Sequence, residues 1–226
     1  MKRALRYAVF DLDNTLYPPD SKMMEVLGRR IQQYMTDRVG LPRELVRPLR
    51  DRYFEQYGTT LSGLIAEHHV DAQEYLAFVH DFPVEEMICP NPELDAALDS
   101  TNLEKVVFTN ASAQHAWRVL RALGIERHFT RVFDVVAMEY VSKPALQVYL
   151  RLLERLPARG GECILFEDSI RNLRPAARLG MVTVLVGEGS EGEEVDFVVP
   201  SITDIGPLFK HLEANGWIAG DGAQGR

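Results

Sequence analysis

The sequence predicts an α/β protein whose core is a Rossmann-like, doubly wound parallel sheet, with a helical cap subdomain inserted after the first strand. Three observations predict this fold. Short apolar runs recur along the chain, helical patterns separate the later runs, and residues 18–88 contain several helical patterns but no convincing strand. We therefore expect a core of residues 1–17 and 89–214, a cap of residues 18–88, and a flexible tail of residues 215–226.

The strands are predicted from apolar runs that are too short to be buried helices. Each run is rich in Val, Ile, Leu or Phe and ends at polar or glycine residues, which suits strands buried on both faces of a parallel sheet. The four clearest runs are YAVF at 7–10, KVVF at 105–108, CILF at 163–166 and MVTVLV at 181–186. A shorter run, FVV at 197–199, is expected to add an edge strand.

Apolar residues at helical spacing predict the helices of the core. One helix is spaced by Trp117, Leu120 and Leu123 and ends at Gly124. A short helix is also expected near 204–213. A further helix is spaced by Leu146, Tyr149, Leu150 and Leu153, with Pro144 in its first turn.

Three apolar stripes predict helices in the cap. They are Met24, Leu27, Ile31 and Tyr34; Leu45, Leu49 and Tyr53; and Tyr75, Phe78 and Val79. Pro48 should kink or shorten the second helix. Thr59, Thr60 and Ser62 lie between Gly58 and Gly63 and predict a loop, which either only links cap helices or closes over a substrate.

The composition limits the classes of partner. The 226 residues include 33 acidic side chains and 25 Lys or Arg, a net charge of −8 that disfavours binding to nucleic acid. Two cysteines cannot form a disulfide framework, and the N-terminus lacks the apolar stretch of a signal peptide. No apolar run reaches the roughly 18 residues of a membrane span. We expect a cytoplasmic monomer or homodimer that binds neither membrane nor nucleic acid.

Polar side chains follow the predicted strands at their carboxyl ends, where open α/β sheets bind ligands. Three runs each end in such residues, and a lysine precedes the helix that begins near Leu146. These segments bring carboxylates, a hydroxyl, an amide and a cation to one edge of the sheet. The residues are Asp11, Asp13, Thr109, Asn110, Lys143, Glu167 and Asp168.

This set of side chains predicts phosphoryl chemistry with a divalent cation. Residues i and i+2 of an extended segment point the same way, so Asp11 and Asp13 can face one small volume. Asp168 would add a third carboxylate, and the three would repel one another without a cation. Mg²⁺ prefers such oxygen ligands, and Mn²⁺ could replace it. With Lys143 as a charge for phosphate oxygens, the site is expected to bind a small phosphorylated metabolite.

Four ordered motifs, DLDNT, FTN, SKP and FEDS, resemble those of the haloacid dehalogenase-like superfamily of phosphohydrolases over residues 11–172. The resemblance implies that Asp11 is a nucleophile that forms an aspartyl-phosphate, and that Asp13 is the general acid and base. It also implies that Thr109 and Asn110 bind the phosphoryl group, while Lys143 neutralises the phosphate and the nucleophile.

The same resemblance implies the metal ligands. Asp11, Asp168 and the backbone carbonyl of Asp13 would hold Mg²⁺, and Glu167 would hold a metal-bound water. Asn172 would either reach this water or cap a helix. Dehalogenases of the superfamily lack an acid at the position of Asp13 and need no metal, so Asp13 favours phosphate esters.

Longer stretches resemble the pyrimidine 5′-nucleotidase branch, whose members remove phosphate from UMP and CMP. These stretches are DLDNTLYP, GTTLSGL, VHDFP, VVFTNASAQHAWRVLRALGI and FEDSIRNLRPAARLGM. The branch usually has a continuous helix at the position of Pro175. A proline is tolerated there if the helix begins near Asn172, because Pro175 would then lie in its first turn. The resemblance implies hydrolysis of pyrimidine nucleoside 5′-monophosphates. The alternatives are a phosphatase for phosphoglycolate, a sugar phosphate or flavin mononucleotide, and a sugar phosphate mutase.

The histidines do not predict a transition-metal site. His68, His69 and His80 have neither a Cys partner nor the His spacing of such a site, so we expect them to face solvent or to pack. His115 lies near the start of a helix at the active edge of the sheet. It is either a supporting or surface residue, or it contacts the substrate.

Overall fold

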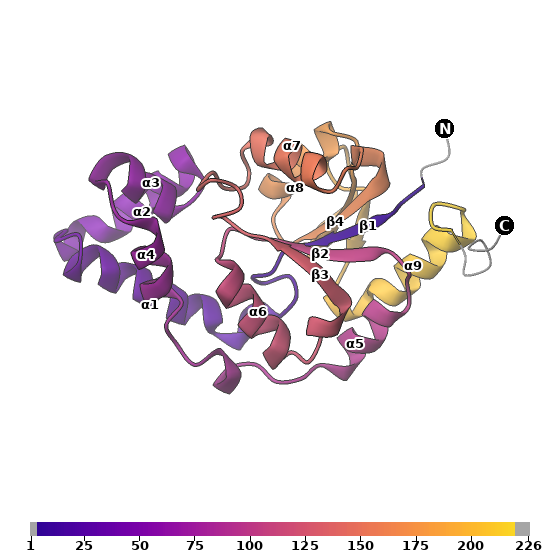
Figure 1. The fold of residues 1–226 in the computed structure, drawn as a ribbon, viewed down its shortest axis with the longest axis horizontal. Helices are drawn as coiled ribbons and strands as arrows, with labels where there is room; N and C mark the ends of the chain where they lie inside the picture. Colours follow the sequence, from indigo (N-terminus) through magenta and orange to yellow (C-terminus); the bar gives the residue numbers. More distant parts are fainter. Residues whose placement is uncertain (1–3, 220–226) are drawn as a thin grey trace.

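Residues 4–219, which the computed structural model describes, form an α/β fold around a six-stranded sheet (Figure 1). Every neighbouring pair of strands is parallel, and the order is β3-β2-β1-β4-β5-β6. The predicted Rossmann-like fold is therefore confirmed. The strands are β1 (Tyr7–Phe10), β2 (Glu104–Phe108), β3 (Phe129–Phe133), β4 (Cys163–Glu167), β5 (Val182–Val186) and β6 (Phe197–Val199).

Helices cover both faces of the sheet, because alternate side chains of each strand point to opposite faces. Phe10 and Phe166 point to the face under α5, α6 and α9, where their rings stack with centroids 4.6 Å apart. Val9 and Leu165 point to the other face, which α7 and α8 cover (Figure 1). These helices are α5 (Pro92–Asp99), α6 (Ala113–Ala122), α7 (Leu146–Arg155), α8 (Ile170–Arg178) and α9 (Ile205–Ala214).

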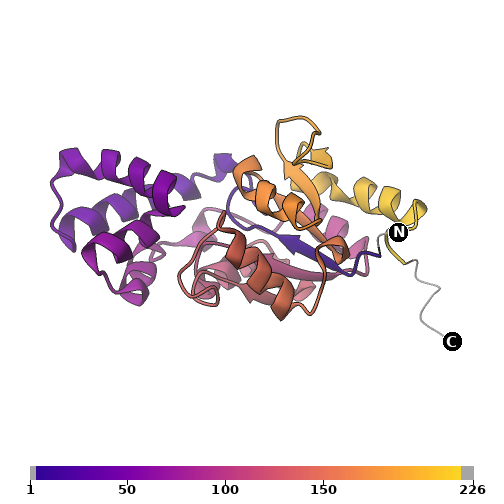
Figure 2. The same ribbon diagram turned by 90° about the horizontal axis from the view of Figure 1, so that it is seen from above.

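Four helices between β1 and α5 form the cap, which lies beyond the carboxyl ends of the strands (Figure 2). They are α1 (Met23–Asp37), α2 (Arg43–Tyr57), α3 (Thr60–His68) and α4 (Ala72–Val79). They enclose a hydrophobic cluster of their own around Tyr34, Tyr53 and Leu64. The cap limits of 18 and 88 stay a prediction. Short 3₁₀ turns connect the elements: η1 (Pro19–Ser21), η2 (Val84–Glu86), η3 (Glu126–His128), η4 (Gly160–Glu162) and η5 (Ile202–Asp204).

Two cap segments differ from the prediction. The predicted loop around Thr59 is the start of α3, because the Thr59 hydroxyl caps the helix by accepting the Ser62 N–H. Pro48 does not shorten α2, which runs uninterrupted from Arg43 to Tyr57. Both Pro48 and Glu44 are exposed. Water can therefore bind the Glu44 carbonyl, for which Pro48 has no N–H.

Three core segments also differ from the prediction. Strand β3 was not predicted because the exposed Thr130 and the half-buried Arg131 break its apolar pattern. Helix α5 was also not predicted from the sequence. Helix α8 begins at Ile170, not near Asn172, so Pro175 lies inside the helix. The Ser169 carbonyl accepts the N–H groups of Asn172 and Leu173, which starts the helix earlier.

Part of the predicted flexible tail, residues 215–226, contacts the core. Residues 215–219 pack back onto the core: the carbonyl of Trp217 accepts the Leu5 N–H at 2.7 Å, and Ile218 is buried. The two apolar side chains account for this packing, which the polar and glycine-rich composition obscured. Residues 220–226 of the predicted tail lie outside the described residues. No helix within residues 4–219 has both the length and the apolar character needed to cross a bilayer.

Gly63→Ala should destabilise the cap. A Cβ at residue 63 would lie 2.2 Å from Cγ of Tyr53, whose ring packs against this face of α3. Relieving the overlap should cost about 1–3 kcal/mol of the free energy of unfolding, measured by urea denaturation. Gly192→Ala is the control, because nothing lies within 4 Å of a Cβ there. Equal effects of the two substitutions would contradict this packing.

Candidate active site

The carboxyl ends of three strands bring most of the predicted site residues together. Asp11 directly follows β1 and Thr109 follows β2. Glu167 is the last residue of β4, and Asp168 comes next. Lys143 reaches the same place from the loop before α7. The register of the sheet sets this arrangement, because β1 pairs with both β2 and β4.

The ammonium group of Lys143 links two of these carboxylates. Its Nζ lies 2.5 Å from Asp11 Oδ1 and 2.7 Å from Glu167 Oε2. Lys143 is only 2% exposed. Burial alone would lower the pKa of this lysine, but the two carboxylates outweigh burial and raise it, so the side chain is charged.

Asn110 holds the backbone of Lys143 in place. Its Oδ1 accepts the Lys143 N–H at 2.8 Å, and its Nδ2 donates to the Lys143 carbonyl at 3.2 Å. Asn110 therefore fixes the loop that carries the lysine. Its predicted contact with a phosphoryl group stays a prediction, for which the second N–H of the amide remains.

Three carboxylates compete for this one cation. Oxygens of Asp11, Glu167 and Asp168 lie within 4.8 Å of one another. Burial, together with the charge of Glu167, raises the pKa of Asp11 to about 7. Burial likewise raises the pKa of Glu167 to about 7, against the opposing effect of Lys143. Negative charge is therefore in excess, even with the lysine present.

These side chains fit a hard divalent cation. Carboxylate oxygens are the ligands that Mg²⁺ prefers, and a cation among them would relieve their repulsion. The carboxylate of Asp13 is not part of this group, so its predicted contribution through the backbone carbonyl stays a prediction. Asn172, from α8, donates to Glu167 Oε1 at 3.1 Å, so it contacts a member of the cluster, while its expected reach to a metal-bound water stays a prediction.

Asp13 lies in a different environment from Asp11. The hydroxyl of Tyr17 donates to its Oδ1 at 2.5 Å, and Nε2 of His115 lies 3.9 Å from the same oxygen. Burial would raise the pKa of Asp13, but His115 and Tyr17 outweigh burial and lower it. Asp13 is thus ionised in the free site, and its carboxylate lines the cavity described below.

Two histidines back this carboxylate, and the sequence did not reveal them as a pair. The rings of His80 and His115 stack with centroids 4.3 Å apart. His115 is 2% exposed, so it is not the surface residue that we considered. Burial and the neighbouring His115 lower the pKa of His80 to about 3, so His80 is neutral. The one sequence signal for His115 was its place near the start of a helix at the active edge of the sheet, where Ser112 caps α6 by accepting the His115 N–H.

Two threonines complete the floor of the site. Thr15 donates from Oγ1 to Asp11 Oδ2 at 3.1 Å. The buried Thr109 accepts the Ala111 N–H on its Oγ1 at 3.0 Å. This bond leaves the hydroxyl of Thr109 to donate to a phosphoryl oxygen, the role that was predicted.

A cavity of about 310 Å³ lies between the cap and this edge of the sheet. Its walls on the cap side are mainly apolar, from Met24, Leu27, Ile31, Leu76 and Val79. Polar groups face it from the core through Asp13 and Asn110 and from the cap through Arg50, Thr59, Thr60 and His80. The cavity is therefore an apolar chamber under the cap that reaches Asp13 and Asn110 at the edge of the candidate site.

The cap touches the loop that carries Lys143. The hydroxyl of Ser142 donates to the carbonyl of Tyr57 at 3.2 Å and lies 3.3 Å from the Ser62 hydroxyl. Arg171, on α8, donates to the carbonyl of Phe54 at 2.8 Å. The cap is thus hydrogen-bonded to the core beside Lys143 and close in sequence to Asp168.

Curated relatives match the chain at low identity. Phosphate metabolism protein 8 of Saccharomyces cerevisiae is 24% identical over 195 residues, which are 78% of this chain and 60% of that protein. The chain therefore spans less than two thirds of that relative. Protein CbbY of Cupriavidus necator is 47% identical over 45 residues, which are 20% of this chain and 18% of that protein.

Solved structures share the fold. An L-2-haloacid dehalogenase from Xanthobacter autotrophicus has a TM-score of 0.59 and 16% identity, over 91% of this chain and 98% of that chain. A Thermotoga maritima protein, provisionally assigned as a β-phosphoglucomutase, has a TM-score of 0.60 and 20% identity, over 92% and 100%. A family model described as haloacid dehalogenase-like hydrolase matches residues 5–180. The chain therefore belongs to the haloacid dehalogenase-like hydrolase family, as its four motifs implied.

Proposed function

We propose that this protein is a Mg²⁺-dependent phosphomonoester hydrolase that works through an aspartyl-phosphate. The observation that carries the proposal is the pair Asp11 and Asp13. Asp11 is bonded to a buried ammonium group, while Asp13 faces the cavity. A nucleophile and a proton carrier are thus available on one short segment.

Each residue then has a defined step. Asp11 attacks the phosphorus, and the bond to the ester oxygen breaks as the Asp11–phosphorus bond forms. Asp13 gives the leaving oxygen a proton, then takes a proton from the water that attacks the aspartyl-phosphate and releases phosphate. The negative phosphate raises the pKa of the neighbouring Asp13, which allows this ionised carboxylate to take up a proton first.

Charge neutralisation comes from the groups around Asp11. Lys143 and the Thr109 hydroxyl would bind phosphoryl oxygens, and Thr15 holds the second oxygen of Asp11. Mg²⁺, held by Asp11 and Asp168 with the Asp13 carbonyl, would supply further positive charge where the phosphoryl group reacts. Glu167 and Asn172 would keep Lys143 and the water near the metal in place.

The cavity favours hydrolysis of an ester whose leaving group carries a ring with apolar faces. A sugar phosphate mutase must bind a hydroxyl-rich sugar in two orientations, but most cap residues that line this cavity cannot donate hydrogen bonds. Asp13 supports phosphate chemistry over dehalogenation. The structural neighbours include a dehalogenase and a protein provisionally assigned as a mutase. Their sequence identity to this chain is so low that they support the shared fold alone.

The proposed substrates are pyrimidine nucleoside 5′-monophosphates. A cavity of about 310 Å³ is at the small end of ligand sites, which suits a single-ring base. The apolar side chains of α1 and α4 that line the cavity can pack against the faces of such a ring. The name of the yeast relative, which refers to phosphate metabolism, agrees with a phosphorylated substrate. Phosphoglycolate, sugar phosphates and flavin mononucleotide are the alternatives that a substrate panel separates.

Asp11→Asn should lower phosphate release from UMP by about 10⁴-fold or more, because an amide cannot form the phosphoenzyme. The assay is phosphate release with Mg²⁺ present. Asp20→Asn is the control, because Asp20 is exposed on η1. Retention of Mg²⁺-dependent activity by Asp11→Asn, with an intact fold, would rule out the mechanism.

Asp13→Asn should affect poor leaving groups most. An alkyl ester such as UMP needs a proton on the leaving oxygen, whereas p-nitrophenyl phosphate leaves as a stable anion. Acid-quenched samples of this variant with p-nitrophenyl phosphate should therefore contain phosphate on Asp11, detected by mass spectrometry. If both substrates lost activity equally and no phosphoenzyme accumulated, the role of Asp13 would be wrong.

Mg²⁺ should stabilise the fold through the carboxylate cluster. At about 100 times its Kd, a ligand of the native state adds about 2.7 kcal/mol, or roughly 5–10 °C in Tm for a domain of this size. Asp168→Asn should reduce this shift. Asp95→Asn is the control. Asp95, Asp99 and His128 form the second candidate group of metal ligands among the described residues, but both of its carboxylates are already paired with Arg127. An unchanged shift in Asp168→Asn would remove Asp168 from the metal site.

A further inference from the structure

One cationic side chain faces the apolar chamber under the cap. Arg50 lines the same cavity as Asp13, but from the cap side on α2. It is the only Lys or Arg among the described residues that line this cavity. The other basic side chain there, His80, is neutral because burial lowers its pKa to about 3. A charged hydrogen-bond donor in a mainly apolar wall is costly unless an acceptor lies beside it.

The surrounding protein gives Arg50 little compensation. Its Nη1 donates to the carbonyl of Gly28 at 3.3 Å, while its Nε is buried without a hydrogen-bond partner. Within residues 4–219, no carboxylate lies within 4.0 Å of its guanidinium nitrogens, although most ion pairs of the protein involve arginine. A half-buried guanidinium with free N–H groups is costly unless a ligand accepts them.

Two features place the guanidinium beside the chamber. It lies against Gly28 on α1, where a Cβ would be 3.7 Å from Nη2, and Leu27 and Ile31 of the same helix line the cavity. Tyr75 of α4 also lines the cavity. Burial raises the pKa of the Tyr75 phenol, and the nearby charge of Arg50 opposes that effect. Arg50 thus stands between α1 and α4, at the side of the cavity formed by the cap.

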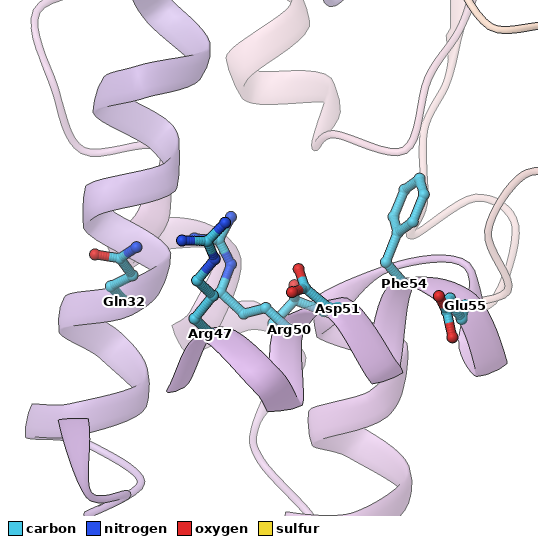
Figure 3. Close-up of a pocket in the computed structure, with 7 residues that line it drawn as sticks. Gln32, Arg47, Arg50, Asp51, Phe54 and Glu55 are labelled. Carbon is cyan, nitrogen blue, oxygen red and sulfur yellow. The ribbon is translucent and has the colours of Figure 1, made fainter. Parts of the chain in front are cut away.

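Arg50 also borders a groove on the outside of the cap, which contains about 530 Å³ (Figure 3). Arg47 and Arg50 extend from α2 toward α1 in this view, where Gln32 lies. Arg47 lines this groove but not the inner cavity. Arg50, Phe54 and Thr60 therefore line both spaces, whereas Arg47, one turn before Arg50 on α2, lines the groove alone.

We propose that Arg50 determines substrate specificity by donating hydrogen bonds to a carbonyl oxygen of a pyrimidine base packed between α1 and α4. This inference rests on the proposed phosphatase function and adds the group that the cap recognises. The acceptor is the C2 carbonyl, which uracil and cytosine share. The apolar walls contact the faces of the ring, and Arg50 contacts its edge.

The test compares Arg50→Met with Arg47→Met. Methionine keeps the length and apolar stem of the side chain but removes every N–H donor. We expect Arg50→Met to lower the ratio of kcat/KM for UMP to that for ribose 5-phosphate by about 10- to 100-fold, the value of a charge-assisted hydrogen bond. CMP should behave like UMP, and Arg50→Lys should recover part of the loss. Arg47→Met should leave the ratio unchanged.

Binding to the Asp11→Asn protein provides a second measurement that does not need turnover. Isothermal titration with UMP should show weaker binding when Arg50→Met is added, by a similar factor. Equal loss on UMP and ribose 5-phosphate would overturn the role of Arg50 while the phosphatase stands. A selective loss on phosphoglycolate would assign Arg50 to a carboxylate instead. The same effect from Arg47→Met would move recognition to the outer groove, and no phosphate release from any ester would overturn both proposals.

Discussion

The arrangement of the site depends on the contacts of one ammonium group, that of Lys143, with two carboxylates. The lysine contacts carboxylates from the ends of β1 and β4, and all three charged groups are buried. Loss of the lysine would leave two buried carboxylates facing each other, which is far more costly than loss of a surface ion pair. Asn110, at the end of β2, keeps the lysine there by bonding its backbone. Three strand ends are thus joined through one side chain.

Two aspartates two residues apart acquire opposite properties from their neighbours. Asp11 has other carboxylates beside it, and its pKa rises, whereas His115 and Tyr17 lower the pKa of Asp13. The carboxylates around Asp11 therefore lack full compensation by positive charge, whereas the carboxylate of Asp13 is already stabilised by its neighbours. This division leaves Asp13 free to carry protons, because it is not needed to neutralise a metal. The stacked His80 packs against His115 and is neutral, because burial lowers its pKa to about 3.

Local patterns predicted every described strand except β3, and the residues at the ends of three of them, because the site residues Asp11, Thr109 and Glu167 lie directly at the ends of apolar runs. The neighbours of Asp13 were not predictable in this way. His80 reaches the site only because the chain returns from the cap to the core, and no local period encodes that return. The glycines at 58 and 63 predict a loop where α3 begins. Gly63 instead lies inside the helix, where the Tyr53 ring leaves no room for a larger side chain. Tertiary packing decided each of these cases.

The C-terminal end of α2 connects substrate recognition to the chemistry. Its last turn gives the carbonyl of Tyr57 to Ser142, the residue before Lys143, and the carbonyl of Phe54 to Arg171, three residues after Asp168. Gly58 follows at φ +86°, and a Cβ there would be 2.9 Å from the Ser142 hydroxyl, so only glycine allows this approach. Arg50 lies on the same helix. In the proposed function, a ligand held by Arg50 would bind the same helix that contacts both the lysine loop and the helix after Asp168, which would couple binding of the leaving group to the phosphoryl site.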